Sequence, residues 1–158
     1  MLLEEQLGEE FRQRGLTIAV AESCTGGLLG SRITDVAGSS EYFLGGVIAY
    51  QNEVKEALLR VSHEVIEAYG AVSAQTAEAM ASGCRDLFKC DIAVSITGIA
   101  GPGGGSAEKP VGLVYVGLST VHGTVSRRFQ WQGSRISNKE SSVRAAMELI
   151  LSELTQGG

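Results

Sequence analysis

Apolar residues recur every four positions at the start of the chain. Leu3, Leu7 and Phe11 follow this spacing, which predicts an amphipathic helix over 3–14. Gly15 is typical of the residue that follows a helix, because glycine adopts a left-handed backbone without a steric penalty. The chain is therefore expected to begin with a helix that buries one face.

Later apolar runs are shorter and predict strands. Residues 16–22 and 91–98 are rich in β-branched side chains, which is typical of buried strands. Residues 42–50 predict a third strand, with a bulge or a close backbone approach at Gly45 and Gly46.

The remaining segments predict a hairpin and further helices. Residues 112–120 and 123–132 alternate in polarity and are separated by two residues, which predicts a β-hairpin. Strands that alternate with helices, plus one hairpin, predict a single α/β domain over 1–158 with a mixed sheet of about five strands. We expect the other helices to run from Thr25–Gly27 to Asp35, from an N-cap at Asn52, from Ser62 or His63 to near Gly70, over 74–88 after a cap at Ser73, and from about Ser137 to Leu154.

Three segments follow the predicted parallel strands. Residues 22–27, 50–55 and 97–110 are also the richest in polar and glycine residues. In α/β sheets, ligands bind beyond the carboxyl ends of the strands. The functional site is therefore expected where these three segments meet.

Composition narrows the classes of partner. The chain has 158 residues and a net charge of -5, and it carries no stripe of Lys or Arg that would be typical of a nucleic-acid-binding face. No apolar run reaches the roughly 18 residues of a membrane span, and the acidic amphipathic start does not resemble a signal peptide. Three cysteines without a CxxC pair favour reduced thiols in the cytoplasm. We expect a cytoplasmic protein without a metal, cofactor, nucleic-acid or membrane partner, and disorder only in the tail 156–158.

Ser23 and Cys24 lie in the turn between the first strand and the next helix. A hydroxyl there can attack a carbonyl group, and helix N-terminal N–H groups can stabilise the resulting oxyanion. The alternative is that Ser23 or Thr25 only caps the helix. Cys24 is a competing nucleophile, since a helix N-terminus lowers the pKa of a thiol.

A serine nucleophile needs a base, and Lys55 is the best placed candidate. It lies in the first turn of a predicted helix, where the helix dipole and partial burial favour the neutral amine. The alternative is an exposed helix lysine. His63 and His122 lie outside the three segments. Glu22 either orients Lys55 or pairs with Arg32.

Two features of the third segment remain open. The glycine-rich loop 98–105 allows backbone N–H groups to approach a ligand closely, or it is a flexible surface loop. Ser106 and Lys109 match the S-x-x-K pattern of β-lactamase-type enzymes, although they lie in a loop and not at a helix start. Tyr50 either packs over the edge of the core or donates its hydroxyl to the site.

Longer motifs are more specific. The chain carries AESCTGGLLG at 21–30, GGVIAYQNEVK at 45–55, GAVS at 70–73, SITGIAGPGGGSAEKPVG at 95–112 and GSR at 133–135. These motifs resemble the C-terminal domain of competence/damage-inducible protein CinA, and still more its stand-alone form, nicotinamide-nucleotide amidase. The resemblance covers residues 7–154.

The resemblance implies a three-layer α/β/α sandwich that forms homo-oligomers, as dimers or trimers. It implies hydrolysis of nicotinamide mononucleotide to nicotinate mononucleotide and ammonia, in pyridine nucleotide recycling. The family's serine and lysine correspond to Ser23 and Lys55. Its tyrosine, threonine and arginine correspond to Tyr50, Thr97 and Arg135. Ser134 departs from the family, which tends to have an acidic residue before the arginine.

These observations together lead to one mechanism and two alternatives. Ser23, activated by Lys55, attacks the carboxamide, and Arg135 pairs with the phosphate. N–H groups near Thr25–Gly27 or in the 98–105 loop hold the oxyanion. Further contacts to the small-molecule nucleotide substrate are expected from Thr25, Gly26, Thr97, Gly98, Gly101 and Gly103. The alternatives are a non-catalytic nucleotide-binding module and a purely structural interaction domain.

Overall fold

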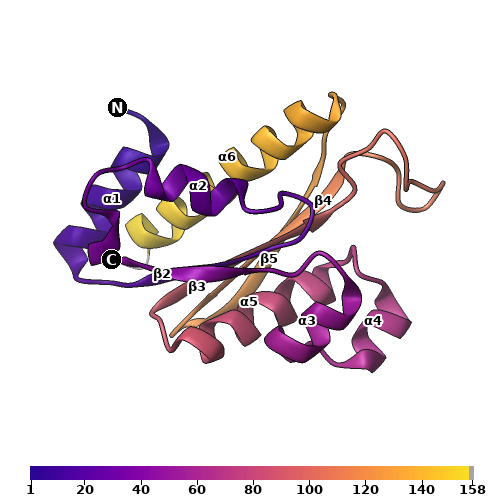
Figure 1. Cartoon of the computed structure of the whole chain (residues 1–158), viewed down its shortest axis with the longest axis horizontal. Coiled ribbons are helices and arrows are strands. Elements are labelled where there is room, and N and C mark those ends of the chain that lie inside the picture. The colour runs from indigo at the N-terminus through magenta and orange to yellow at the C-terminus, as the bar shows by residue number, and fades with distance from the viewer. Residues whose placement is uncertain (157–158) are drawn as a thin grey trace.

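A mixed sheet of five strands lies between two layers of helices in the computed structural model, which describes residues 1–156 (Figure 1). The strand order is β2-β1-β3-β4-β5, in which β1 (Ile18–Glu22) pairs in parallel with both β2 (Phe43–Ile48) and β3 (Ile92–Gly98). The hairpin β4 (Leu113–Thr120) and β5 (Gly123–Gln130) adds antiparallel pairs beyond β3. The predicted three-layer α/β/α sandwich is confirmed.

Three helices cover each face of the sheet (Figure 1). One layer contains α1 (Leu3–Arg14), α2 (Leu28–Thr34) and α6 (Arg135–Gln156). The other contains α3 (Asn52–Leu59), α4 (His63–Tyr69) and α5 (Ala74–Phe88). A single 3-10 turn, η1 (Ser39–Glu41), precedes β2.

The two faces of the sheet carry side chains of different size. Ile18 and Val20 of β1 belong to the larger core under α1, α2 and α6, whereas Ala19 faces the α5 side. On that side a Cβ added to Gly117 of β4 would lie 2.4 Å from the carbonyl oxygen of Ala77 in α5. Small residues therefore allow α5 to pack unusually close to the sheet.

α5 in turn positions α3. A Cβ added to Gly83 of α5 would lie 1.7 Å from the carbonyl oxygen of Leu59, at the end of α3. Only glycine permits this backbone approach. The depth at which α3 lies, and with it the position of Lys55, is set by this contact.

Helix and strand boundaries mostly follow the predictions. The helices at 3–14 and 74–88 are confirmed, and the register of β1 with β2 shifts next to Gly45, as the predicted bulge requires.

Asn52 is the first residue of α3 and Gln51 occupies the N-cap position, so the predicted cap is wrong. The last helix begins at Arg135, earlier than predicted, because Ser134 caps it by accepting a bond from the backbone N–H of Ser137. Of the tail, Gln156 lies in α6 and residues 157–158 lie outside the described residues.

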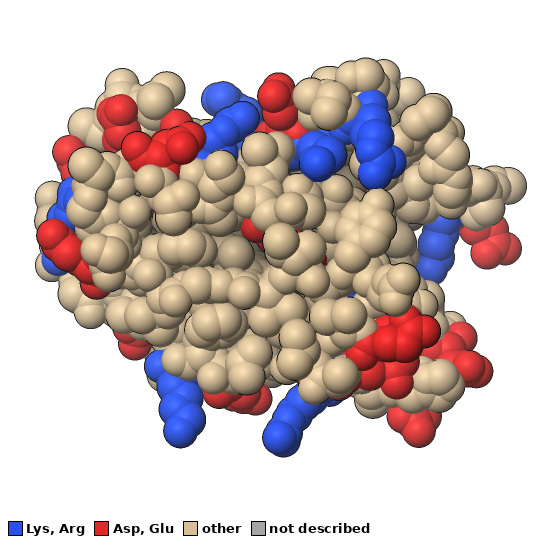
Figure 2. Space-filling model, in the orientation of Figure 1, with Lys and Arg blue, Asp and Glu red and all other residues tan. Residues whose placement is uncertain are grey.

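A crevice lies at the carboxyl ends of β1, β2 and β3, lined by residues that follow these three strands. β1 leads to α2 on one face, and the neighbouring β2 leads to α3 on the other (Figure 1). Ligand sites in α/β sheets form where neighbouring strands lead to helices on opposite faces of the sheet. Figure 2 shows mixed charges on the face it presents, with basic side chains above, at the start of α6, and acidic ones below, near α4.

Candidate functional site

Ser23 and Lys55 meet in this crevice. Ser23 directly follows β1, and its backbone N–H still donates to the carbonyl oxygen of Ile96 in β3, which fixes the turn to the sheet. Lys55 reaches back from α3 and places its Nζ 3.1 Å from the Ser23 Oγ. Ser23 is 8% exposed and Lys55 is 1% exposed. Two residues that the sequence places in different segments therefore form one buried pair.

The surroundings of Lys55 favour a neutral amine. Its Nζ donates to the carbonyl oxygens of Ala49, at 2.9 Å, and Tyr50, at 3.4 Å. Within residues 1–156 no carboxylate forms an ion pair with it. Burial lowers the pKa of Lys55 below its ordinary value of 10.5, because a buried ammonium loses its hydration. An amine with a lowered pKa beside a hydroxyl is suited to accept its proton.

Glu22 has neither of its expected roles. Its carboxylate accepts bonds from the Thr25 hydroxyl at 2.6 Å and from the backbone N–H groups of Leu29 at 2.9 Å and Gly30 at 3.0 Å. Glu22 therefore caps α2, where the helix dipole favours a negative charge. Arg32 lies 3.9 Å from Glu140 instead.

The cap removes part of the expected oxyanion site. The α2 N–H groups that bond Glu22 are not free for a ligand, and the Thr25 hydroxyl is buried and directed to the same carboxylate. Neither Thr25 nor Gly26 lines the cavity beside Ser23. Of the expected binding residues, these two are the ones that the structure places elsewhere.

That cavity has a volume of about 260 Å³ and brings together all three predicted segments. Thr97, Gly98, Gly101 and Gly103 line it as expected. Its other lining residues are Ser23, Cys24, Tyr50, Asn52, Lys55, Ala71, Val72, Ile99, Ala100, Gly104 and Arg135.

Reasoning from the residues did not single out Asn52, Ala71 or Val72 for the site, and Ala71 and Val72 lie outside the three predicted segments. The sequence pattern predicts Asn52 only as a helix cap, whereas the residue lines the cavity and its side chain has no hydrogen-bond partner within residues 1–156. Ala71 and Val72 come from the GAVS motif between α4 and α5, which carries no obvious chemistry. Thr97 connects the segment of Ala71 and Val72 to β3, since its hydroxyl donates to the Ala71 carbonyl oxygen at 2.8 Å.

Arg135 closes the outer side of the cavity. Its Nη1 donates to the carbonyl oxygen of Gly101 at 2.7 Å, and its Nη2 donates to the Tyr50 hydroxyl at 3.2 Å. Tyr50 and Arg135 are both exposed, so the Tyr50 ring does not pack into the core. A permanently charged guanidinium therefore stands at the entrance, above the buried pair.

The alternative nucleophiles and bases are less suited to this chemistry. Burial raises the pKa of the Cys24 thiol to about 12, which keeps it protonated near neutral pH. The Ser106 Oγ accepts from the backbone N–H of Lys109, whose Nζ donates to a carbonyl oxygen in α4. His63 lies at the surface between two glutamates, and His122 lies in the β4–β5 turn.

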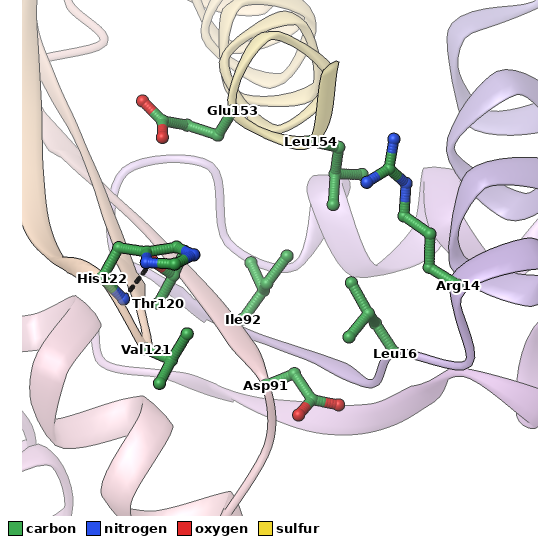
Figure 3. Close-up of a pocket in the computed structure, with 9 residues that line it drawn as sticks. All are labelled: Arg14, Leu16, Asp91, Ile92, Thr120, Val121, His122, Glu153 and Leu154. Carbon is green, nitrogen blue, oxygen red and sulfur yellow. Dashed lines mark hydrogen bonds between the residues drawn. The ribbon is translucent and has the colours of Figure 1, made fainter. Parts of the chain in front are cut away.

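A second cavity, of about 290 Å³, lies at the opposite end of the strands, near the start of β3 (Figure 3). Arg14 on its rim pairs with Glu10 at 2.9 Å, and Asp91 accepts from the backbone N–H of Thr17 at 2.8 Å. Figure 3 shows no serine or lysine in it; its lining residues are Arg14, Leu16, Asp91, Ile92, Thr120, Val121, His122, Glu153 and Leu154. It holds no counterpart of the Ser23–Lys55 pair, so the cavity beside Ser23 is the better candidate.

Residues 1–156 contain no group of three or more His, Cys, Asp or Glu side chains arranged to hold a metal ion. No helix in this range combines the length and the apolar character needed to cross a membrane.

Comparisons with known proteins agree with the fold. The family model described as CinA C-terminal domain matches residues 2–154. The chain is 48% identical over 154 residues to a CinA-like protein of Desulfotalea psychrophila, covering 98% of this chain and 37% of that protein. It is 59% identical over 128 residues to a CinA-like protein of Acaryochloris marina, covering 81% of this chain and 30% of that protein. The chain thus spans about a third of the length of these relatives.

A solved structure covers nearly the same length. The competence/damage inducible protein CihA from Agrobacterium tumefaciens superposes with a TM-score of 0.94 at 39% identity, over 97% of this chain and 93% of that chain. The competence damage-inducible protein A of Klebsiella pneumoniae gives the same TM-score at 29% identity, over 97% of this chain and 95% of that chain.

Proposed function

Given that the chain belongs to the CinA C-terminal domain family, we propose that it is an amidohydrolase that converts nicotinamide mononucleotide to nicotinate mononucleotide and ammonia. Ser23 is the nucleophile and Lys55 is its base. The sequence motifs support the choice of substrate, and the geometry of the site supports the chemistry.

One observation carries the proposal: the 3.1 Å contact between the Lys55 Nζ and the Ser23 Oγ, with both groups buried. A lysine that only stabilised the fold or bound an anion would remain charged, and burial would then cost free energy without a compensating carboxylate. A neutral amine has two N–H bonds and one lone pair. Its N–H bonds suit the carbonyl oxygens of Ala49 and Tyr50, so the lone pair is left for the serine proton.

The reaction then proceeds in two halves. Lys55 takes the Ser23 proton while the serine oxygen bonds to the carboxamide carbon, which gives a tetrahedral oxyanion. As the C–N bond breaks, Lys55 returns the proton to the leaving nitrogen, and ammonia departs. A water molecule, deprotonated by Lys55, then attacks the ester, and the serine oxygen leaves with that proton to restore the enzyme.

The glycine-rich loop supplies the best oxyanion donors. The backbone N–H groups of Ala100 and Gly101 have no hydrogen-bond partner within residues 1–156, and both residues line the cavity. Gly101 has a φ of 89°, a conformation that favours glycine. We assign the oxyanion to this loop and not to the start of α2, because Glu22 already occupies that helix end.

Arg135 and Tyr50 are placed to bind the distant part of the substrate. The guanidinium can pair with the phosphate in a bidentate arrangement through two parallel hydrogen bonds. Ser134 replaces the acidic residue that the family tends to have, and serine and aspartate are both strong N-caps. The substitution therefore preserves the helix start that positions Arg135.

Ammonia release from nicotinamide mononucleotide by the purified protein tests the proposal. Ser23→Ala and Lys55→Met should each lower kcat by about 10³-fold or more, whereas Arg135→Ala should act mainly through KM. Ser106→Ala is the matched control, since it removes the serine of the competing S-x-x-K motif, and it should retain full activity.

Each other outcome has a distinct meaning. Near-normal turnover by Ser23→Ala would exclude Ser23 as the nucleophile. If the wild-type protein binds the mononucleotide and releases no ammonia, the chain is a nucleotide-binding module. If it neither binds nor turns over this compound, the proposed substrate is wrong.

A further inference from the structure

A buried asparagine links the two segments that form the outer wall of the cavity. Asn138 lies in the first turn of α6 and is 1% exposed. Its Nδ2 donates to the carbonyl oxygen of Ala100 at 3.0 Å, across 38 positions of sequence, and to that of Gly133 at 3.1 Å. Its Oδ1 accepts from the backbone N–H of Gly133 at 3.0 Å. Three of the four hydrogen bonds that an asparagine side chain can make are thus formed inside the protein.

Both segments held by Asn138 belong to the proposed site. Ala100 and Gly101 are the proposed oxyanion donors, and Gly133 precedes Arg135 by two residues. The Arg135 guanidinium bonds the Gly101 carbonyl oxygen at 2.7 Å, so the loop and the arginine are also joined directly. Gly133 accepts this arrangement because it lacks a Cβ, which would lie 2.6 Å from the Ser137 Oγ.

We propose that Asn138 is a positioning residue that holds the 98–105 loop and Arg135 in register for substrate binding, an inference that rests on the proposed function for its link to catalysis. It does not line the cavity. It acts through the Ala100 carbonyl and through the backbone turn before Arg135.

The chemistry of the amide explains why this position needs asparagine. Leucine has a similar size and makes none of the three bonds. Aspartate keeps an acceptor for the Gly133 N–H but has no donor for the two carbonyl oxygens when ionised. Burying a carbonyl group without its partner is unfavourable, so the loop is expected to move away from α6 in both variants.

Amide hydrogen exchange tests the structural part without any substrate. In Asn138→Leu and Asn138→Asp, peptides covering 98–105 should exchange about tenfold faster than in the wild-type protein. Ser142→Ala is the control: Ser142 is a wholly buried polar residue one turn further along α6. Its hydroxyl accepts from the Trp131 Nε1 and donates to the Asn138 carbonyl oxygen, and neither bond involves the loop. Unchanged loop exchange in both Asn138 variants would overturn the inference.

A double-mutant cycle tests the link to binding. Asn138→Leu should raise KM for the mononucleotide about tenfold when Arg135 is present and much less in an Arg135→Ala background, because the two residues act together. A merely structural role would raise KM by the same factor in both backgrounds, and that result would overturn the inference.

The two proposals fail separately. If wild-type protein releases no ammonia, the proposed function fails, and the exchange experiment still decides whether Asn138 holds the loop. In that case the double-mutant cycle uses the dissociation constant of the mononucleotide in place of KM. If the mononucleotide does not bind either, the link to binding is overturned.

Discussion

Replacing Glu22 by glutamine tests whether the carboxylate that precedes Ser23 stabilises the fold as a helix cap. The ionised side chain accepts three hydrogen bonds and is 1% exposed. Glutamine keeps one oxygen, which can still accept from Thr25 and Leu29. Its amide group would then face the backbone N–H of Gly30, where two donors oppose each other.

The expected cost follows from these contacts. A buried N–H that loses its partner costs about 1–3 kcal/mol, and loss of the charge removes about 0.3–1 kcal/mol of interaction with the α2 dipole. The two remaining bonds also weaken, because bonds to a neutral oxygen are weaker than bonds to a carboxylate. We therefore expect Glu22→Gln to lower the free energy of unfolding by about 3 kcal/mol.

Urea unfolding measures this change. With a slope of about 2 kcal/mol per molar urea, the midpoint should fall by about 1.5 M. Glu78→Gln is the control, because Glu78 accepts a single bond, from the Ser126 hydroxyl at 2.7 Å, and its replacement should cost about 1 kcal/mol. A Glu22→Gln midpoint equal to that of the wild-type protein, or an equal loss in Glu78→Gln, would show that the Glu22 carboxylate does not stabilise the fold as a helix cap.

Three further outcomes follow from the site and its packing. Because only neutral Lys55 can act as the base, kcat/KM should rise tenfold per pH unit until the pH reaches the lowered pKa of Lys55, and the plateau should begin below pH 10.5. Lys55→Arg, whose side chain stays charged, should be inactive at every pH of the pH–rate profile. Cys24→Ala should release ammonia at a rate within about twofold of the wild-type protein. A thiol reagent should modify Cys24 slowly in the native protein, since the pKa of this thiol is about 12, and rapid loss of activity on modification would contradict this. Gly83→Ala should lower Tm by several degrees in a thermal melt, because the new methyl group meets the carbonyl oxygen of Leu59, and an unchanged Tm would show that α3 is free to move.

The sequence alone determined the elements of the fold and the edge at which the site lies. Hydrophobic spacing and Gly15 predicted α1 to the residue, and the Ser73 cap marked the start of α5, because each helix has a strong signal at one end. The parallel strands have carboxyl ends rich in polar and glycine residues, and the rule for α/β sheets then places Ser23 and Lys55 at one edge.

Only the tertiary structure decided which partner each polar group takes. Glu22 had two plausible partners along the chain and bonds neither of them, because the α2 N–H groups lie nearer once the turn at 23–27 is formed. Sequence spacing cannot rank such contacts, since side chains are brought together by packing and not by their separation along the chain.

The same limit applies to burial and to distant contacts. Whether Lys55 is a surface lysine or a buried base depends on how deeply α3 lies, which Gly83 of α5 sets from 28 positions away. The bond from Asn138 to Ala100 spans 38 positions and has no local signal in the sequence. The lowered pKa of Lys55 is therefore a property of the assembled layers, because it arises from the loss of water around the amine.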